Sequence, residues 1–247
     1  MFFFFKKTKI IVDCFTDEPG AFEFHPIERA TNNYPDWWKR LDKSVVEHTD
    51  VGEIQRATMR SCDGIISLFK NSWVLKSWTD IRLRTTANEY FYYFGKKTLN
   101  PFHAEIVSHN PVQFGDQFNE KIHLKILSPW YLKQNKSCDF AMMPSVWNDI
   151  NNWSNFTIMP GVGNFLYQHS TNINMFVEKH KDHILIEAGT PFYHIVPLTD
   201  KDVVFKNHLT TVDELNKLIH KRYGKFYKNY RYMQKFIESK KTCPFDR

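Results

Sequence analysis

Residues 121–127 read Lys-Ile-His-Leu-Lys-Ile-Leu, a stretch in which polar and apolar side chains alternate without a break until Ser128-Pro129. Successive side chains of a β-strand point to opposite faces, so this pattern is typical of a strand with one buried face and one exposed face. Proline cannot donate to a sheet ladder, and the strand is expected to end there. The stretch therefore predicts a sheet that packs on a core through one face.

Similar stretches lie on both sides of this strand. Alternation from residue 73 to residue 84 predicts a strand pair or one long strand. Its two faces would hold Trp73, Leu75, Thr79, Ile81 and Leu83, and Lys76, Trp78, Asp80, Arg82 and Arg84. Further short strands are expected at 1–12, 88–94, 140–144, 156–160, 173–177, 183–186 and 193–196. Between them, residues 17–20 predict a turn, 34–40 an irregular segment, and Asp63 is placed to cap a short helix over 63–69.

The composition agrees with a β-rich globular fold. At 247 residues the chain is long enough to bury roughly 70 to 75% of its unfolded surface. Aromatic residues are 16% of the chain, against 9 Gly and 11 Pro, which favours strands and large contact surfaces over linkers. We therefore expect a mainly β fold, a β-sandwich, jelly-roll or β-clip-like domain with a C-terminal amphipathic helix.

Cysteine spacing and hydropathy exclude several classes of protein. The four cysteines lie far apart in sequence, which argues against a structural zinc site or a disulfide framework and favours a reducing compartment. No stretch approaches the roughly 18 apolar residues of a membrane-spanning helix, so no membrane partner is expected. No cofactor-binding motif is intact, and no cofactor is expected to bind.

The net charge is concentrated at the C-terminus. Residues 210–247 hold ten of the 33 Lys and Arg residues and four of the 27 Asp and Glu residues, which leaves 23 of each in the rest of the chain. The formal charge of +6 is therefore that of this segment alone. We expect a neutral β-rich body at 1–209, with 121–200 as its core, and a basic aromatic helix at 210–247. Thr211-Val212-Asp213-Glu214 matches a capping box at its start, and Gly224 marks a bend or a break.

Three interpretations of this helix stay open. Its apolar residues pack on the body or on a neighbouring subunit while the lysines stay solvated, which is the interpretation we favour. Alternatively, its cations contact phosphates and its tyrosines stack on bases. A membrane-surface helix would need a more continuous apolar face with fewer tyrosines. The candidate contacts to a partner or to DNA are Lys217, Lys221, Arg222, Lys225, Tyr227, Lys228, Tyr230 and Arg231.

Residues 156–198 resemble the deoxyuridine triphosphatase and deoxycytidine deaminase superfamily. The resemblance rests on Gly161-Val162-Gly163-Asn164-Phe165-Leu166-Tyr167 and on the strands that follow. In that superfamily the Tyr packs on the deoxyribose and an Asp activates the attacking water. Tyr167 keeps the Tyr position, but Asn164 stands in place of the Asp, and an amide cannot act as a general base. The resemblance therefore implies a nucleotide site at Asn164 and Tyr167 without catalytic residues, and a jelly-roll-like domain unrelated to nucleotide enzymes stays open.

Four other stretches resemble proteins encoded by tailed bacteriophages. They are Tyr34-Pro35-Asp36-Trp37-Trp38, Thr58-Met59-Arg60-Ser61-Cys62-Asp63-Gly64-Ile65, Ile126-Leu127-Ser128-Pro129-Trp130 and Gly189-Thr190-Pro191-Phe192. The resemblance implies a viral setting and carries no activity with it.

Metal and nucleophile chemistry find little support. His103-Ala104-Glu105 resembles half of a two-His-one-carboxylate iron site, but the strands after His180 and His194 lack the Arg that would hold an oxo-acid. Neither a Gly-x-Ser-x-Gly turn nor a Gly-rich phosphate loop occurs. We predict no metal ligands and no catalytic nucleophile.

The leading hypothesis is a non-enzymatic structural or assembly protein of a tailed phage, located in the virion and assembled in the host cytoplasm. It would bind other virion proteins, or further copies of itself, through exposed Trp, Tyr and Phe side chains, and its basic helix would reach a partner or DNA. One alternative is a deoxynucleotide hydrolase or deaminase relative. The second alternative is a nucleic-acid-binding module.

Overall fold

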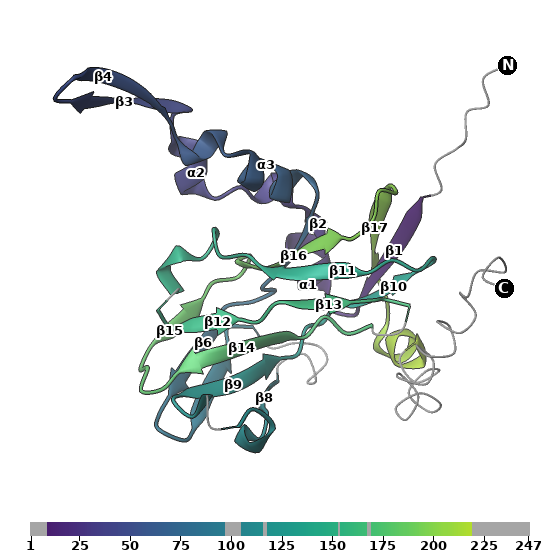
Figure 1. Ribbon diagram of the computed structural model, residues 1–247. Helices are drawn as coiled ribbons and strands as arrows, with labels where there is room; N and C mark the ends of the chain where they lie inside the picture. Colours follow the sequence, from purple (N-terminus) through teal and green to yellow (C-terminus); the bar gives the residue numbers. More distant parts are fainter. Residues whose placement is uncertain (1–8, 97–104, 116–117, 153, 167–168, 219–247) are drawn as a thin grey trace, which may run out of the picture. The chain divides into compact units, whose positions relative to one another are not determined.

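The computed structural model describes residues 9–96, 105–115, 118–152, 154–166 and 169–218 (Figure 1). Contacts divide the chain into two compact units, Met1–Leu209 and Thr210–Arg247. The first unit is mainly β, as the sequence predicts, with several antiparallel sheets and few helices. The predicted first strand begins at Ile10 in the described chain, and residues 1–8 lie outside it.

The strands of the described part form five sheets. The first has the order β10 (Tyr131–Gln134), β1 (Ile10–Thr16), β17 (Val203–Leu209). The second has the order β13 (Gly161–Gly163), β11 (Phe140–Pro144), β16 (Pro191–Pro197), β5 (Trp73–Lys76), β2 (Glu28–Arg29). The third has the order β12 (Phe156–Ile158), β14 (Ile173–Glu178), β9 (Lys121–Ile126), β8 (Ile106–Ser108). The others are β15 (Ile184–Ile186), β6 (Ile81–Thr85), β7 (Tyr90–Phe94), and the hairpin of β3 (Ser44–Thr49) and β4 (Gly52–Ala57).

Short helices connect these strands. The α-helices are α1 (Pro19–Phe24), α2 (Asp36–Arg40) and α3 (Asp63–Lys70), and the 3₁₀ helices are η1 (Ala30–Asn33), η2 (Met59–Ser61), η4 (Pro111–Gln113) and η6 (Ile150–Asn152). The predicted turn at 17–20 instead opens α1, because Pro19 suits the first turn of a helix. The segment 34–40, expected to be irregular, contains α2. In α3, Cys62 is the N-cap and Asp63 is the first helical residue, without a capping hydrogen bond.

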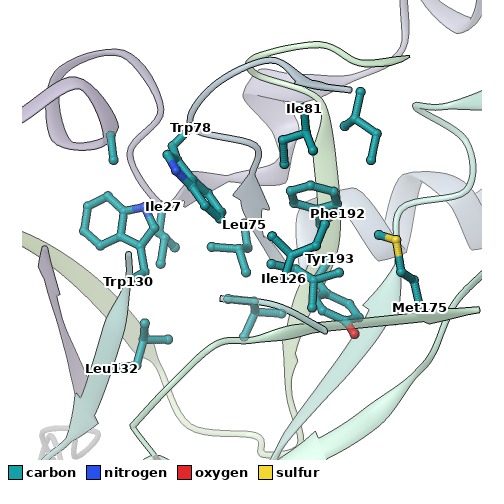
Figure 2. Packing of buried hydrophobic residues seen from close by; sticks show 14 of the residues in the cluster. Ile27, Leu75, Trp78, Ile81, Ile126, Trp130, Leu132, Met175, Phe192 and Tyr193 are labelled. Carbon is teal, nitrogen blue, oxygen red and sulfur yellow. The ribbon is translucent and has the colours of Figure 1, made fainter. Parts of the chain in front are cut away.

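The core is shared by four of the sheets. Figure 2 shows Trp130 and Leu132 of the first sheet region close to Ile27, Leu75 and Trp78, with Phe192 and Met175 further along the same cluster. The side chains that the core buries most fully include Trp130, Phe140, Phe192, Leu75, Leu83, Leu124 and Ile126. These residues come from distant parts of the chain, so the core depends on strand pairings that are far apart in sequence.

The stretch 121–127 forms β9, but only part of its predicted pattern holds. Leu124 and Ile126 are buried in the main core, as expected. His123 on the opposite face is also buried, because its ring packs between those of His109, Phe114 and Phe176. Both faces of β9 are thus covered at this position.

Of the two predicted alternatives, residues 73–84 form two strands, β5 and β6, which lie in different sheets and do not pair with each other. The predicted alternation is correct in β6, where Arg82 and Arg84 are exposed between buried residues. It is wrong at Lys76 and Trp78, which are both buried, because both faces of β5 are covered and Trp78 packs in the main core. Lys76 is tolerated there because its Nζ lies 2.6 Å from Oε1 of Glu28 on β2.

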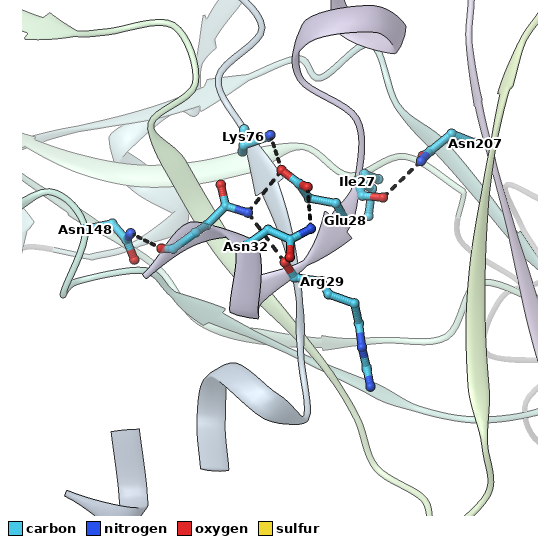
Figure 3. A network of polar contacts seen from close by, with 8 residues as sticks. Ile27, Glu28, Arg29, Asn32, Lys76, Asn148 and Asn207 are labelled. Carbon is cyan, nitrogen blue, oxygen red and sulfur yellow. Dashed lines mark hydrogen bonds and ion pairs between the residues drawn. The ribbon is translucent and has the colours of Figure 1, made fainter. Parts of the chain in front are cut away.

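Glu28 anchors a polar network beside β5 (Figure 3). Its carboxylate accepts hydrogen bonds from Lys76, Asn32 and Asn33. Burial alone would raise the pKa of Glu28, but these hydrogen bonds outweigh it and leave the pKa lowered. Asn148 donates to the carbonyl of Asn33 at 2.8 Å, which ties η1 to the loop after β11. The network fixes the chain just before α2, and therefore the start of the β3–β4 hairpin.

Candidate binding surfaces

The side chain of Asn164, predicted to contact a nucleotide, is hydrogen-bonded within its own turn and to the residue before β11. Its Nδ2 donates to Oδ1 of Asp139 at 2.7 Å and its Oδ1 accepts from the backbone N–H of Leu166 at 3.1 Å. The strand before it, β13, pairs with β11 and lies in a different sheet from the next strand, β14. Tyr167 lies outside the described residues. The structure therefore places Asn164 beside a carboxylate, with both ends of its amide engaged.

The start of the C-terminal helix is described as far as residue 218. Its capping box is confirmed: the Thr211 N–H donates to Oε2 of Glu214 at 3.1 Å, and the Glu214 N–H donates to Oγ1 of Thr211 at 3.3 Å. Lys217 is exposed on this helix. The other predicted contacts, Lys221, Arg222, Lys225, Tyr227, Lys228, Tyr230 and Arg231, lie outside the described residues.

A pocket of about 450 Å³ opens beside β16. Its lining residues are Pro144, Ser145, Val146, Asp149, Asn152, Phe156, Thr157, Ile158, Pro160 and Pro191. Asp149 is its one carboxylate among these residues. Burial raises the pKa of Asp149 while a hydrogen bond from Asn152 opposes the shift. Asn152 also donates to the carbonyl of Leu185 at 3.0 Å, so this pair ties the pocket wall to β15.

Ser145 contacts a buried histidine behind the pocket. Its Oγ lies 3.0 Å from Nε2 of His194, and Nδ1 of His194 lies 2.9 Å from Oγ of Ser72. The orienting group is thus a second serine in place of the carboxylate of a catalytic triad. Burial lowers the pKa of His194 to about 4, which makes its ring a weak base near neutral pH. The arrangement suits a neutral hydrogen-bonding bridge between β5, β11 and β16.

The β3–β4 hairpin, residues 44–57, is exposed along its whole length and is called the arm below. Every residue of β4 is exposed, and so are four of the six in β3. In the described part of the chain β3 and β4 pair only with each other, and Figure 1 shows the arm extending beyond the other sheets of its unit. Its turn is tight, because Thr49 pairs with Gly52, whose φ of 124° suits glycine. Apolar side chains lie on both faces and at the tip: Val45, Val46, Val51 and Ile54.

The arm stands on a stem formed by residues 36–43 and 58–61. The Arg60 guanidinium donates to the carbonyls of Lys39 and Leu41, each at 2.7 Å. Ser61 Oγ donates to the Lys43 carbonyl at 2.9 Å. The hydroxyl of Thr58 donates to the Asp42 carbonyl, and its N–H donates to the Lys43 carbonyl at 3.0 Å. These bonds join both ends of the arm to α2 and η2.

Stacked rings connect the stem to the body. The Trp38 ring lies 4.3 Å from that of Tyr34, which lies 4.5 Å from Phe69 on α3. The Phe69 ring meets His194 edge-on at 4.7 Å. The indole N–H of Trp38 donates to the Met59 carbonyl at 3.0 Å. The direction of the arm is thus set by packed aromatic side chains.

The outer face of the β15-β6-β7 sheet exposes aromatic rings beside arginines. Directly opposed residues of antiparallel strands lie on one face. Arg82 is opposite Tyr93 on one side and Leu185 on the other, and Arg84 is opposite Phe91. Tyr93 is 64% exposed, Phe91 52% and Leu185 43%. These five residues are called the Arg-aromatic face below.

Tryptophans do not contribute to these surfaces in the described part of the chain. Trp73, Trp78 and Trp130 are buried, and Trp37, Trp38 and Trp147 are half-buried. The expectation of exposed Trp is therefore wrong for these six, and the exposed rings are those of Phe and Tyr. Phe91 and Tyr93 were not singled out from the sequence, because five consecutive aromatic residues at 90–94 do not show which side chains are exposed. The signal was the neighbouring Arg-x-Arg pattern at 82–84.

The described residues contain neither a metal-type cluster of side chains nor a membrane-spanning helix. No group of three His, Cys, Asp or Glu residues there is placed to hold a metal ion, and His103 lies outside that part. Within the same part of the chain, no helix has the length and apolar character needed to cross a membrane. Comparison with protein-family models, with curated proteins and with solved structures finds no match to this chain.

Proposed function

We propose that the protein is a non-enzymatic assembly protein that binds other proteins of a virus particle through its arm. The observation that carries this proposal is a two-stranded hairpin, exposed on both faces, that has no third strand in the described chain. A hairpin alone is marginally stable in water, and its open edges offer unpaired N–H and C=O groups. A partner that adds a strand or covers the valines would satisfy both needs.

The stem supports this role because it orients the arm in advance. Arg60, Thr58 and Ser61 bond the stem to itself, so little freedom is left to lose when a partner binds. Two of the four stretches that resemble tailed-phage proteins, 34–38 and 58–65, build this stem. The proposed setting is therefore a virion assembled in the host cytoplasm, with another virion protein, or a second copy of the chain, on the arm.

The chemistry of the pocket agrees with a binding role. Ser145 in its wall lies beside His194, a buried histidine whose lowered pKa makes it a weak base at pH 7. No carboxylate among the described residues orients that histidine. A general base works best when its pKa lies near the working pH. The DNA contact of the C-terminal helix remains part of the proposal, carried by its charge alone.

The proposal is tested with a photo-reactive amino acid at position 51, the tip of the arm, where Val51 is 91% exposed. In particles assembled during infection, it should crosslink the chain to a structural protein of the particle or to another copy. The same amino acid at position 198, where Leu198 is 54% exposed on the body, is the matched control and should crosslink less. Absence of the chain from purified particles and from their assembly intermediates would contradict the proposal.

A deoxynucleotide hydrolase is the second candidate, and one observation favours it. Oδ1 of Asp139 lies 2.7 Å from Nδ2 of Asn164, which puts an exposed carboxylate next to one of the two predicted nucleotide residues. The test is light scattering of the purified chain, with and without deoxyuridine triphosphate, together with an assay of released pyrophosphate. We expect an unchanged mass and no release. Hydrolysis that is lost in Asp139→Asn would establish the enzyme instead.

A further inference from the structure

We propose that the Arg-aromatic face binds single-stranded nucleic acid, with Phe91 and Tyr93 stacking on bases and Arg82 and Arg84 contacting phosphates. Its residues belong to the first unit and are not part of the arm. Proteins that bind single strands combine aromatic stacking surfaces with cations that follow the backbone. The face presents the two kinds of side chain in adjacent rows, with the arginines on β6 and the rings opposite them on β7.

The rings are free to accept bases. Neither Phe91 nor Tyr93 contacts another ring among the described residues, and both are more than half exposed. Their neighbours Tyr90 and Tyr92, by contrast, stack on each other at 6.2 Å and face the core side of the sheet. The two free rings therefore add nothing to the core, and their exposure costs solubility unless a partner covers them.

The spacing of the rings fits unstacked bases. Residues two apart on a strand lie roughly 6.7 Å apart along it. Bases stacked in a duplex lie about 3.4 Å apart, so rings at twice that distance match bases separated from each other, as they are when single strands bind proteins. The arrangement favours a single strand over a double helix.

The arginines supply local charge at the centre of the face. Arg82 has no carboxylate within ion-pair distance among the described residues, and the Arg84–Asp182 pair is long, at 3.6 Å, with both partners well exposed. Such exposed surface pairs contribute little to stability, so a phosphate can replace Asp182. Arginine also stacks on bases and binds phosphate oxygens in pairs.

Acidic residues around the face confine its positive electrostatic potential to the two arginines. Asp80, Glu89, Asp182 and Glu187 lie on the strand ends and turns that border the face. Asp80 is already engaged, since its Oδ1 accepts the N–H of Ala188 at 2.8 Å. The face therefore has two phosphate contacts and no broad positive surface, and its affinity should depend on the rings as much as on charge.

The test is the fluorescence anisotropy of a labelled oligothymidylate titrated with the full chain. Phe91→Ala combined with Tyr93→Ala should weaken binding at least about 20-fold, because each base stacked on a ring contributes roughly five- to a hundredfold. Phe91→Tyr combined with Tyr93→Phe keeps both rings and should bind like the unaltered chain. Phe24→Ala, which removes a ring that is 69% exposed on α1, is the matched control and should change nothing.

The salt dependence separates the arginines from the rings. Arg82→Ala combined with Arg84→Ala should reduce the slope of log affinity against log salt by about 1.4, since each phosphate contact to a single strand contributes roughly 0.7. The ring variants should keep the slope, and Arg40→Ala on α2 is the control for charge. Because residues 210–247 are unchanged in all variants, their contribution is the same throughout.

Three results would overturn the proposal. The unaltered chain fails to bind oligothymidylate at low salt, the ring variants bind it as tightly as the unaltered chain, or a duplex binds as tightly as the single strand. A change in the solution mass of the chain on Phe91→Ala and Tyr93→Ala, without an effect on oligothymidylate, would assign the face to a contact between copies instead.

Discussion

Among the described histidines, His123 and His194 are the two whose pKa the fold lowers furthest. Burial lowers the pKa of each to about 4, and His109 and Lys125 add to the shift at His123. Below pH 6.5 the unfolded chain takes up a proton at each ring while the folded chain does not, until the pH reaches about 4. The contribution of each histidine to the free energy of unfolding is therefore fully present above pH 6.5. It falls by about 1.4 kcal/mol per pH unit as the pH decreases from 6.5 to 4.

The first prediction concerns His123→Phe. The Nδ1 of His123 is buried without a hydrogen-bond partner among the described residues, and the ring sits among Phe114, Phe176 and His109, so a phenyl ring fits its surroundings. We expect the variant to be more stable than the original by about 2 kcal/mol near pH 5 and to show a shallower loss between pH 6.5 and 4. Urea unfolding across this pH range measures both.

His183→Phe is the control for that experiment, because His183 is exposed. It should leave the pH dependence as it was. If His123→Phe keeps the full slope of the original chain, the ring of His123 titrates in the folded protein and the argument from burial fails.

Among the elements, the arm depends most on bonds outside its own strands. Its cross-strand pairs Glu47–Arg56, at 2.6 Å, and His48–Glu53, at 3.2 Å, are exposed and contribute little. The Arg60 guanidinium instead joins two carbonyls at the base of the arm, and hydrogen bonds from a charged donor contribute about 1.5–3 kcal/mol. The order of the arm is thus decided at its stem.

The second prediction is that Arg60→Ala loosens the arm and leaves the body intact. Amides of residues 44–57 should exchange hydrogen roughly tenfold faster or more, whereas those of β5 and β16 should not change. Hydrogen exchange followed by mass spectrometry of peptides measures this. Arg40→Ala removes an exposed arginine from α2 and should have no effect. Equal exchange in Arg60→Ala and the original chain would show that the arm holds itself together.

Sequence patterns located several strands of the body. β11 has the predicted bounds, and β9 and β14 differ from them by one residue. The arm was missed because both of its faces are exposed, so Ser44–Thr49 has no alternation to detect. β17 was missed for a related reason, since most of its residues are half-buried on both faces.

The candidate surfaces were harder to predict than the strands. Arg82 and Arg84 were placed correctly on an outer face, but their neighbours depend on the register of β6 against β7, which alternation does not give. Likewise, Asn164 was singled out by resemblance, while its partner Asp139 lies 25 residues away in sequence and is brought to it by β11. One β-strand can be predicted from its own sequence, but a surface that spans several β-strands depends on pairings that only the folded chain shows.

At the scale of the whole molecule, the first unit is closed by a pairing of its two ends. β1 and β17 run parallel over seven positions, from Ile10 opposite Val203 to Thr16 opposite Leu209. β10 covers the other edge of β1. Ile10, Val12 and Cys14 of β1 are buried in the core, so this strand needs both neighbours in place. The unit therefore requires the chain as far as Leu209.

The last prediction follows from this closure. A chain that ends at residue 209 should keep the body folded, with a thermal midpoint within a few degrees of that of the full chain, because the contacts divide at this point. A chain that ends at residue 202 loses β17, opens an edge of β1 to water and should not fold cooperatively. Circular dichroism during heating distinguishes the two. The 1–209 chain also has no net charge from Lys, Arg, Asp and Glu. If this chain still binds oligothymidylate, and Phe91→Ala with Tyr93→Ala abolishes that binding, the binding belongs to the Arg-aromatic face alone. If 1–209 does not fold, the basic segment is part of the body, and the separation of charge in the sequence does not correspond to a separation in the fold.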